Sequence, residues 1–158
     1  MCTCSAETYE WNPLSLVVPS ERDFDPYGGD LDAQYAWREF GGLSLPEAYQ
    51  HFLDCPENRQ EDFMFMGPKA FLFYFPVIER YLYSVCVSHE LDYCPTWILG
   101  QAFISQLKQA GADEVPELRR RVAKLAGFVR SHLDRYAMDP EEKEMIDTGW
   151  AELEQLLG

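Results

Sequence analysis

The stretch EDFMFMGPKAFLFYFPVIERYLYSVCVS, residues 61–88, decides the fold of this sequence. Between Phe71 and Val87, 13 of 17 positions are apolar or aromatic, whereas the segments before and after are amphipathic and heavily charged. A stretch of this composition is stable in water only when other elements cover it. We therefore predict that it forms the buried central element of the protein.

The spacing of the polar residues within this stretch favours a helix over a strand. Phe, Tyr and Val favour strands by propensity, but Arg80, Ser84 and Ser88 lie within about 80° of one another at helical spacing. Gly67-Pro68 suits the first turn of a helix, because proline there loses no needed hydrogen bond. Pro76 should kink or divide the helix. A membrane span is not expected, since charged residues interrupt the apolar run well before about 20 residues.

Composition and charge restrict the classes of partner. A chain of 158 residues with 47% hydrophobic and 15% aromatic content fits one domain with a substantial core. The net charge is −14: residues 1–62 carry −10, residues 63–138 carry +2 and residues 139–158 carry −6. Such a field repels nucleic acids and anionic lipids and attracts basic proteins. Solubility alone is an equally good explanation of the charge.

The cysteines and the first residues indicate a cytoplasmic protein. The five cysteines are odd in number and irregularly spaced, which is typical of free thiols in a reducing compartment. The first residues lack the basic region and apolar core of a signal peptide.

Capping signals divide the chain into helices. We expect residues 1–29 to be largely irregular and residues 30–158 to form one compact all-α domain of about six or seven helices. Asp30 should cap a helix that buries Leu31, Tyr35 and Phe40, and Ser44-Leu-Pro-Glu47 is a capping box. Later helices are expected at about 56–66, 96–110, 115–136 and 139–157, from the spacing of their apolar residues.

Two sets of residues have incomplete metal-site patterns. Asp23, Asp25 and Gly28 match a calcium loop, but the glutamate required at its end is replaced by Gln34. His51 and Cys55, taken together with a second His and Cys at positions 89 and 94, lack the paired short spacings of structural zinc sites. We therefore predict no metal site, and no motif indicates a cofactor.

Glu61 and Asp62 are the candidate acid–base pair. They stand beside Phe63-Met-Phe-Met66, and an apolar pocket around a carboxyl group raises its pKa. Acids that face solvent at a helix end are the alternative explanation. The one basic cluster, which includes Arg119, Arg120 and Arg121, lies on the polar face of an amphipathic helix, and we expect it to pair with acids of neighbouring helices rather than with nucleic acid.

Two segments resemble a bacterial family of small helical proteins without assigned activity. They are WREFGGLSL, residues 37–45, and QEDFMFMGPKAF, residues 60–71. The resemblance extends over roughly positions 35–90, about a third of the chain. It implies a compact helical bacterial protein and assigns no catalytic residue.

These observations lead to three functional hypotheses. The first is a non-enzymatic acidic binding protein, of the bacterial immunity or antitoxin kind, that masks a basic protein such as a toxin. Its candidate contact residues are Asp23, Asp25, Tyr27, Asp30 and Asp32. The second is a small enzyme with a carboxylate or cysteine site near Glu61 and Asp62. The third is an oligomeric helical scaffold.

Overall fold

The computed structural model describes residues 9–85, 96–109 and 115–158, and all regular secondary structure in these ranges is helical. This confirms the predicted all-α class. Six of the described helices have ten or more residues: α2 (Leu31–Phe40), α3 (Leu45–Asp54), α6 (Pro68–Ser84), α7 (Thr96–Lys108), α8 (Pro116–Ser131) and α9 (Pro140–Leu157). The short helices are α1 (Glu21–Phe24), α4 (Pro56–Arg59), α5 (Asp62–Phe65) and the 3-10 helix η1 (Leu133–Arg135).

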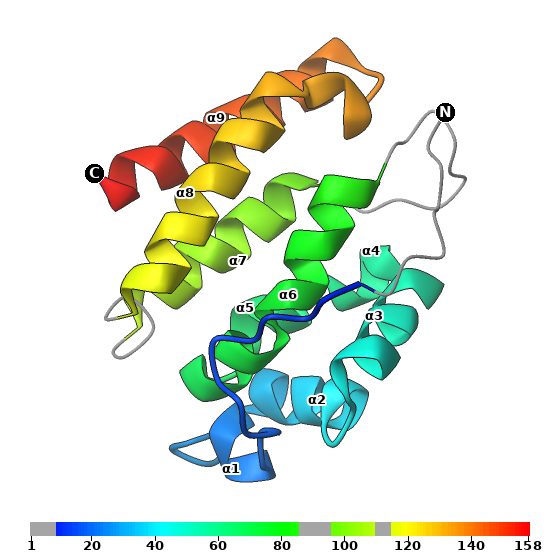
Figure 1. Cartoon of the computed structure of the whole chain (residues 1–158), viewed down its shortest axis with the longest axis vertical. Coiled ribbons are helices and arrows are strands. Elements are labelled where there is room, and N and C mark those ends of the chain that lie inside the picture. The colour runs from blue at the N-terminus through cyan, green and yellow to red at the C-terminus, as the bar shows by residue number, and fades with distance from the viewer. Residues whose placement is uncertain (1–8, 86–95, 110–114) are drawn as a thin grey trace.

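Helix α6 is the central element, as predicted. It packs against α1 and α3 on one side and against α7 and α8 on the other, and α9 covers α7 and α8 (Figure 1). Ten of its residues are buried, and its Phe71 and Phe75 make edge-on ring contacts with Phe103 of α7. Phe103 in turn contacts Trp150 of α9, which is fully buried. One aromatic cluster therefore joins the central helix to two of the helices that cover it.

Pro76 does not divide α6, contrary to one of the outcomes predicted for it. A proline has no N–H to donate to the carbonyl four residues earlier, which here belongs to Leu72. That carbonyl accepts the backbone N–H of Leu14 at 3.1 Å instead. The proline thus leaves an acceptor that holds the N-terminal segment against α6.

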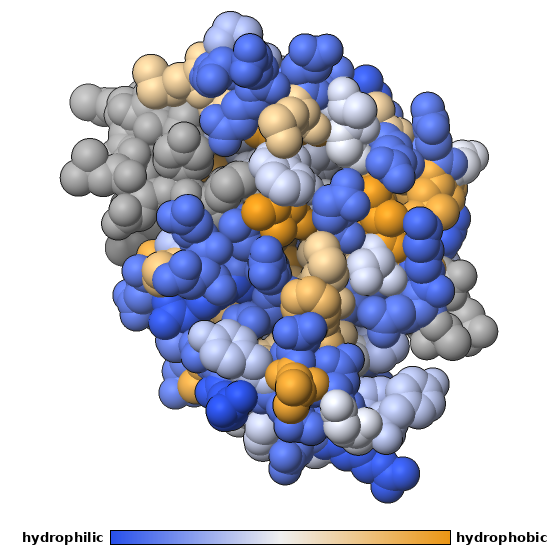
Figure 2. All heavy atoms as spheres, turned by 180° about the vertical axis from the view of Figure 1, so that it is seen from behind, coloured by the Kyte–Doolittle hydropathy of each residue, from blue (hydrophilic) through white to orange (hydrophobic). Residues whose placement is uncertain are grey.

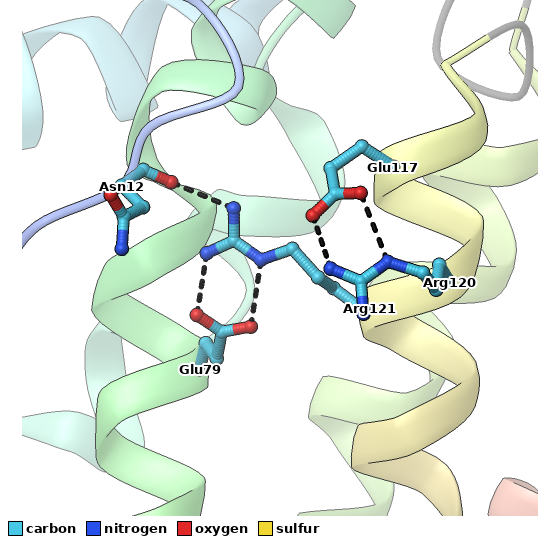
Figure 3. A network of polar contacts seen from close by, with 5 residues as sticks. All are labelled: Asn12, Glu79, Glu117, Arg120 and Arg121. Atoms are coloured by element: carbon cyan, nitrogen blue, oxygen red, sulfur yellow. Dashed lines mark hydrogen bonds and ion pairs between the residues drawn. The ribbon is translucent and has the colours of Figure 1, made fainter.

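An ion pair and a stacked arginine fasten the same N-terminal segment, residues 9–14. Arg121 of α8 binds Glu79 of α6 through two hydrogen bonds of 3.0 and 2.6 Å and donates a third, of 2.7 Å, to the Asn12 carbonyl (Figure 3). The Arg80 guanidinium lies 4.5 Å from the ring centre of Tyr9 and 5.1 Å from that of Trp11. Residues far apart in the sequence thereby meet on one side of α6.

Helix α2 buries a different face from the one predicted. Leu31 and Tyr35 were expected inside, but their exposed fractions are 77% and 48%, while Ala33, Ala36 and Phe40 are buried. Helices α1 and α5 both pack against α2, and small alanine side chains permit this close approach. Two large apolar side chains are left on the surface as a result.

Three other segments differ from the predictions in detail. Within residues 1–29, Glu21–Phe24 forms one helical turn because Ser20 and Asp23 make a reciprocal capping box. The segment expected as one helix before α6 forms two separate turns, α4 and α5. Helix α8 ends at Ser131 instead of continuing to Tyr136, whose hydroxyl donates to the Leu82 carbonyl at 2.6 Å near the end of α6.

Part of the basic cluster pairs with acids of neighbouring helices, as expected, but Arg120 pairs with Glu117 of its own helix and Arg119 donates to the Leu157 carbonyl. Besides the pair between Arg121 and Glu79, Arg130 binds Asp147 at 2.9 Å and Glu154 at 2.7 Å, both on α9. The back of the molecule presents a mainly hydrophilic surface with small apolar areas (Figure 2). No helix among the described residues is both long enough and apolar enough to cross a membrane.

Candidate functional site

The loop between α1 and α2 brings together the five residues predicted to contact a partner. Gly28 and Gly29 both have positive φ, +73° and +84°, which non-glycine residues adopt only with strain. Asp25 closes the loop, because its carboxylate accepts the N–H of Asp30 at 3.3 Å and the side-chain amide of Gln34 at 3.1 Å. Gln34, which breaks the calcium-loop pattern, therefore supplies a hydrogen bond in place of a metal ligand.

The capping acids of this loop lie at the surface. Asp30 accepts the backbone N–H groups of Asp32 and Ala33 at 3.0 and 3.1 Å, and Asp23 caps α1. Asp30 and Asp32 are exposed, and Asp23 is partly exposed. A helix N-terminus favours negative charge, so these acids stabilise the starts of α1 and α2 while they hold the loop in shape.

Exposed apolar side chains lie among these acids. Tyr27 is 97% exposed, and Leu31 and Tyr35 stand one helical turn apart on the outer side of α2. The Arg38 guanidinium lies 5.7 Å from the Tyr35 ring centre. We call this surface the acidic face, and it comprises Asp23, Asp25, Tyr27, Asp30, Leu31, Asp32 and Tyr35. The sequence indicated five of its members, but Leu31 and Tyr35 were wrongly assigned to the core.

A pocket of about 280 Å³ opens beside the acidic face. Asp25, Tyr27 and Asp30 line it. Met64 and Phe65 of α5, Ser105 of α7 and Gln109, which follows α7, line it as well. An aromatic or aliphatic side chain of a partner fits such a pocket, and the carboxylates at its edge favour a basic neighbour.

Gly67 fixes the position of α1 and its loop relative to α6. Its N–H donates to the Phe24 carbonyl at 2.8 Å, and a Cβ added to it would lie 2.1 Å from the Asp23 carbonyl oxygen. No side chain fits in this space. The sequence indicated Gly67 only as the entry to a helix, because its contact with α1 depends on residues more than 40 positions away.

Gly67→Ala is expected to destabilise the protein by roughly 1–3 kcal/mol, because α1 must move away from α6 to admit the methyl group. Urea denaturation measures this cost. As a control, Gly127→Ala should cost less, because Gly127 lies in α8 without a positive φ and no described atom lies within 4 Å of an added Cβ. Equal costs for the two variants would contradict the close contact.

Asp62, the second candidate site, is separated from its predicted partner. Glu61 is exposed, whereas Asp62 is only 4% exposed and its Oδ2 has no hydrogen-bond partner among the described residues. Burial raises the pKa of Asp62 to about 7, and the negative charge of Glu39 adds to the rise while Arg59 opposes it. The two carboxyl groups therefore do not form a matched pair. Asp62 alone is a carboxyl group that holds its proton near neutral pH.

A polar cluster that the sequence did not reveal contributes to the surroundings of Asp62. His51 Nε2 lies 2.9 Å from Glu39 Oε2, and Arg59 Nε lies 3.4 Å from the same oxygen. The hydrogen bond with His51 lowers the pKa of Glu39, and the charges of His51 and Arg59 lower it further. Glu39 therefore remains ionised and helps keep Asp62 protonated. No short motif links these three residues, which lie on different helices.

The residues weighed as metal ligands do not assemble a site within the described ranges. No group of three or more His, Cys, Asp or Glu side chains there is arranged to hold a metal ion. Cys55 is a free, partly buried thiol at the junction of α3 and α4. The His and Cys at positions 89 and 94, weighed with it as zinc ligands, lie outside the described residues.

No protein-family model, curated protein or solved structure matches the chain. The resemblance of residues 37–45 and 60–71 to a bacterial family therefore stays a prediction. The fold and the geometry of the acidic face are the basis for a functional proposal.

Proposed function

We propose that this chain is a non-enzymatic binding protein that masks a basic protein with its acidic face. The exposure of Tyr27, Leu31 and Tyr35 among four aspartates is the observation that carries the proposal. Protein interfaces combine central aromatic anchors with charged surroundings that steer the partner into place. A cytoplasmic immunity or antitoxin protein that covers a basic toxin is the biological role that fits this chemistry.

The local charge around the face supports a basic partner. Residues 1–62 carry a net charge of −10, and the four aspartates of the face lie within ten consecutive positions. The loop that presents them is held by caps, by the two glycines and by the contact of Gly67 with α1. A face that is already ordered before binding loses little conformational entropy on association. Little of the electrostatic attraction to a partner is therefore offset by the cost of ordering the loop.

The buried Asp62 is the observation that favours an enzyme as a second candidate. A carboxyl group with a pKa near 7 is suited to acid–base chemistry. However, Asp62 is 4% exposed, and the α5 residues that line the pocket beside the acidic face are Met64 and Phe65. A protein-binding role therefore accounts for more of the surface than a catalytic role for Asp62.

Two charge-matched triple variants test the proposal. The partner is first captured from the source cell with the wild-type chain. Its affinity is then measured for Asp25→Asn/Asp30→Asn/Asp32→Asn and for Glu10→Gln/Glu57→Gln/Glu61→Gln, which removes the same charge from exposed positions outside the face. Asparagine caps a helix as well as aspartate, so the first variant keeps its fold. We expect it to weaken binding at least about 30-fold, and the control variant to change it less than about threefold.

Adding Tyr27→Ala should weaken binding further, by roughly tenfold, if the tyrosine is an anchor. Equal losses in the two triple variants would show that only the overall charge matters and would contradict a binding role for the acidic face.

A further inference from the structure

A second groove is lined by residues of α7 and α9. Helix α9 lies at the opposite end of the molecule from α1 (Figure 1). The volume of the groove is about 530 Å³. Trp97 of α7 and Met145 and Gly149 of α9 supply apolar surface, and Met145 is 51% exposed. Glu141, Glu144 and Glu152 also line the groove, and no lysine or arginine does. The groove is therefore apolar inside and acidic along α9.

Gly149 is a buried glycine in the lining of this groove, and no described side chain occupies the space where its Cβ would lie. Glycine inside a helix is less favourable than alanine, and Gly149 lies in the middle of α9 with ordinary helical φ. No atom of the described residues lies within 4 Å of a Cβ added to it. By contrast, a Cβ on Gly100 of α7 would lie 3.2 Å from the Trp150 indole nitrogen. Packing against Trp150 explains Gly100, whereas no described neighbour requires a glycine at position 149.

The three groove glutamates differ from the other acids of α9 in their pairing. Asp147 and Glu154 are bound by Arg130 of α8. Among the described residues, no ion pair within 4.0 Å involves Glu141, Glu144 or Glu152. Their negative charges are uncompensated next to an apolar surface. A partner that brings cations and apolar side chains together would satisfy both features.

We propose that this groove binds an amphipathic helical segment of a partner, with lysine or arginine on its flanks and a large aliphatic residue above Gly149. Glu141 and Glu152 are eleven positions apart, which corresponds to about 16 Å along a helix, or three turns. Two packed helices present a groove into which the apolar face of a third helix fits. This site is separate from the acidic face, and the inference does not depend on the function proposed for that face.

The probe is a labelled 14-residue amphipathic peptide of leucine and lysine, which is titrated into the full chain. The salt concentration is about 100 mM, because exposed charges more than about 10 Å apart are then largely screened. We expect saturable binding with a blue shift of tryptophan emission that Trp97→Phe removes. A leucine and glutamate peptide of the same pattern should not bind. Absence of binding by the lysine peptide would overturn the proposal.

Variants locate the binding site. Gly149→Leu should weaken peptide binding at least tenfold. Gly127→Leu, at a helical glycine of α8 where an added Cβ likewise has no described atom within 4 Å, should leave it unchanged. Glu141→Gln/Glu144→Gln/Glu152→Gln should weaken binding at least tenfold, and Asp25→Asn/Asp30→Asn/Asp32→Asn should not. Circular dichroism verifies that each variant is folded. If Gly149→Leu fails to fold, the triple glutamine variant, which changes only side chains lining an open groove, tests whether the peptide binds in this groove.

Two outcomes would assign the groove differently. Equal weakening by the α9 and loop variants would show non-specific attraction to an acidic protein and would overturn the proposal. The other outcome is a wild-type dimer in sedimentation, which Gly149→Leu dissociates and Gly127→Leu does not. The groove would then hold a second copy of the chain, and the proposal would again be overturned.

Discussion

Asp62→Asn is expected to stabilise the protein by about 2–4 kcal/mol at pH 8 and to have little effect at pH 4. Asp62 is 4% exposed, and burial raises its pKa to about 7. Below its ordinary pKa, the carboxyl group is protonated in both the folded and the unfolded chain. As the pH rises toward 7, the unfolded chain releases the proton first, so the wild-type protein loses stability over this window. Above about pH 7 the loss is complete and constant.

Urea denaturation of the wild type and the variant between pH 4 and pH 8 measures this difference. Asparagine has the shape of the protonated acid but does not ionise, so the gain should grow through the window and then level off. Glu61→Gln, next in the sequence and exposed, should show no such growth. A variant that is less stable than the wild type at pH 8 would mean that the folded protein needs the Asp62 carboxylate in its ionised form.

Arg121→Met is expected to destabilise the protein by about 2–4 kcal/mol. The side chains of Arg121 and Glu79 are only 12% and 13% exposed, so removal of the arginine leaves a largely buried carboxylate without its two hydrogen bonds. The Asn12 carbonyl loses its donor as well (Figure 3). The free energy of unfolding from urea denaturation measures the cost.

Two comparisons separate the stability cost of leaving a buried charge unpaired from the cost of losing an ion pair as such. Arg121→Met/Glu79→Leu should recover most of the loss, because no unpaired charge then remains. Arg120→Met removes the neighbouring pair with Glu117, in which the side chains are 65% and 48% exposed. Exposed pairs contribute little, so this variant should have hardly any effect. Comparable losses for Arg120→Met and Arg121→Met would contradict the role given to burial.

Features that depend on a few neighbouring residues were predictable from the sequence. The capping box of Ser44 and Glu47, the cap at Asp30 and the start of α6 after Gly67 all occur as expected. The apolar spacing of α7 and of most of α8 likewise matches the buried faces. Caps and periodicity are local properties, so a single sequence contains the information they require.

Features that depend on tertiary packing were not predictable. The apolar spacing placed Leu31 and Tyr35 inside, but α2 turns its alanines toward α1 and α5. The effect of Pro76 depends on Leu14, which supplies the hydrogen bond that the Leu72 carbonyl lacks within the helix. These outcomes are set by partners distant in sequence.

The candidate site shows the same division. The sequence indicated the four aspartates and Tyr27, and the structure adds the exposed side chains of α2 and the pocket residue Ser105 of α7. The composition around Asp62 indicated an apolar environment. The ionised Glu39, which helps keep Asp62 protonated, lies on another helix and has no signal in the sequence.

The most direct test of a steering role for the acidic face is the rate constant for association with the captured partner as a function of salt. Between about 50 and 400 mM salt, screening should lower this rate constant at least tenfold, while the dissociation rate constant changes little. Asp25→Asn/Asp30→Asn/Asp32→Asn should associate slowly at low salt and show a much weaker salt dependence. A wild-type association rate constant that stays the same across this range would contradict electrostatic recognition of a basic protein by the acidic face.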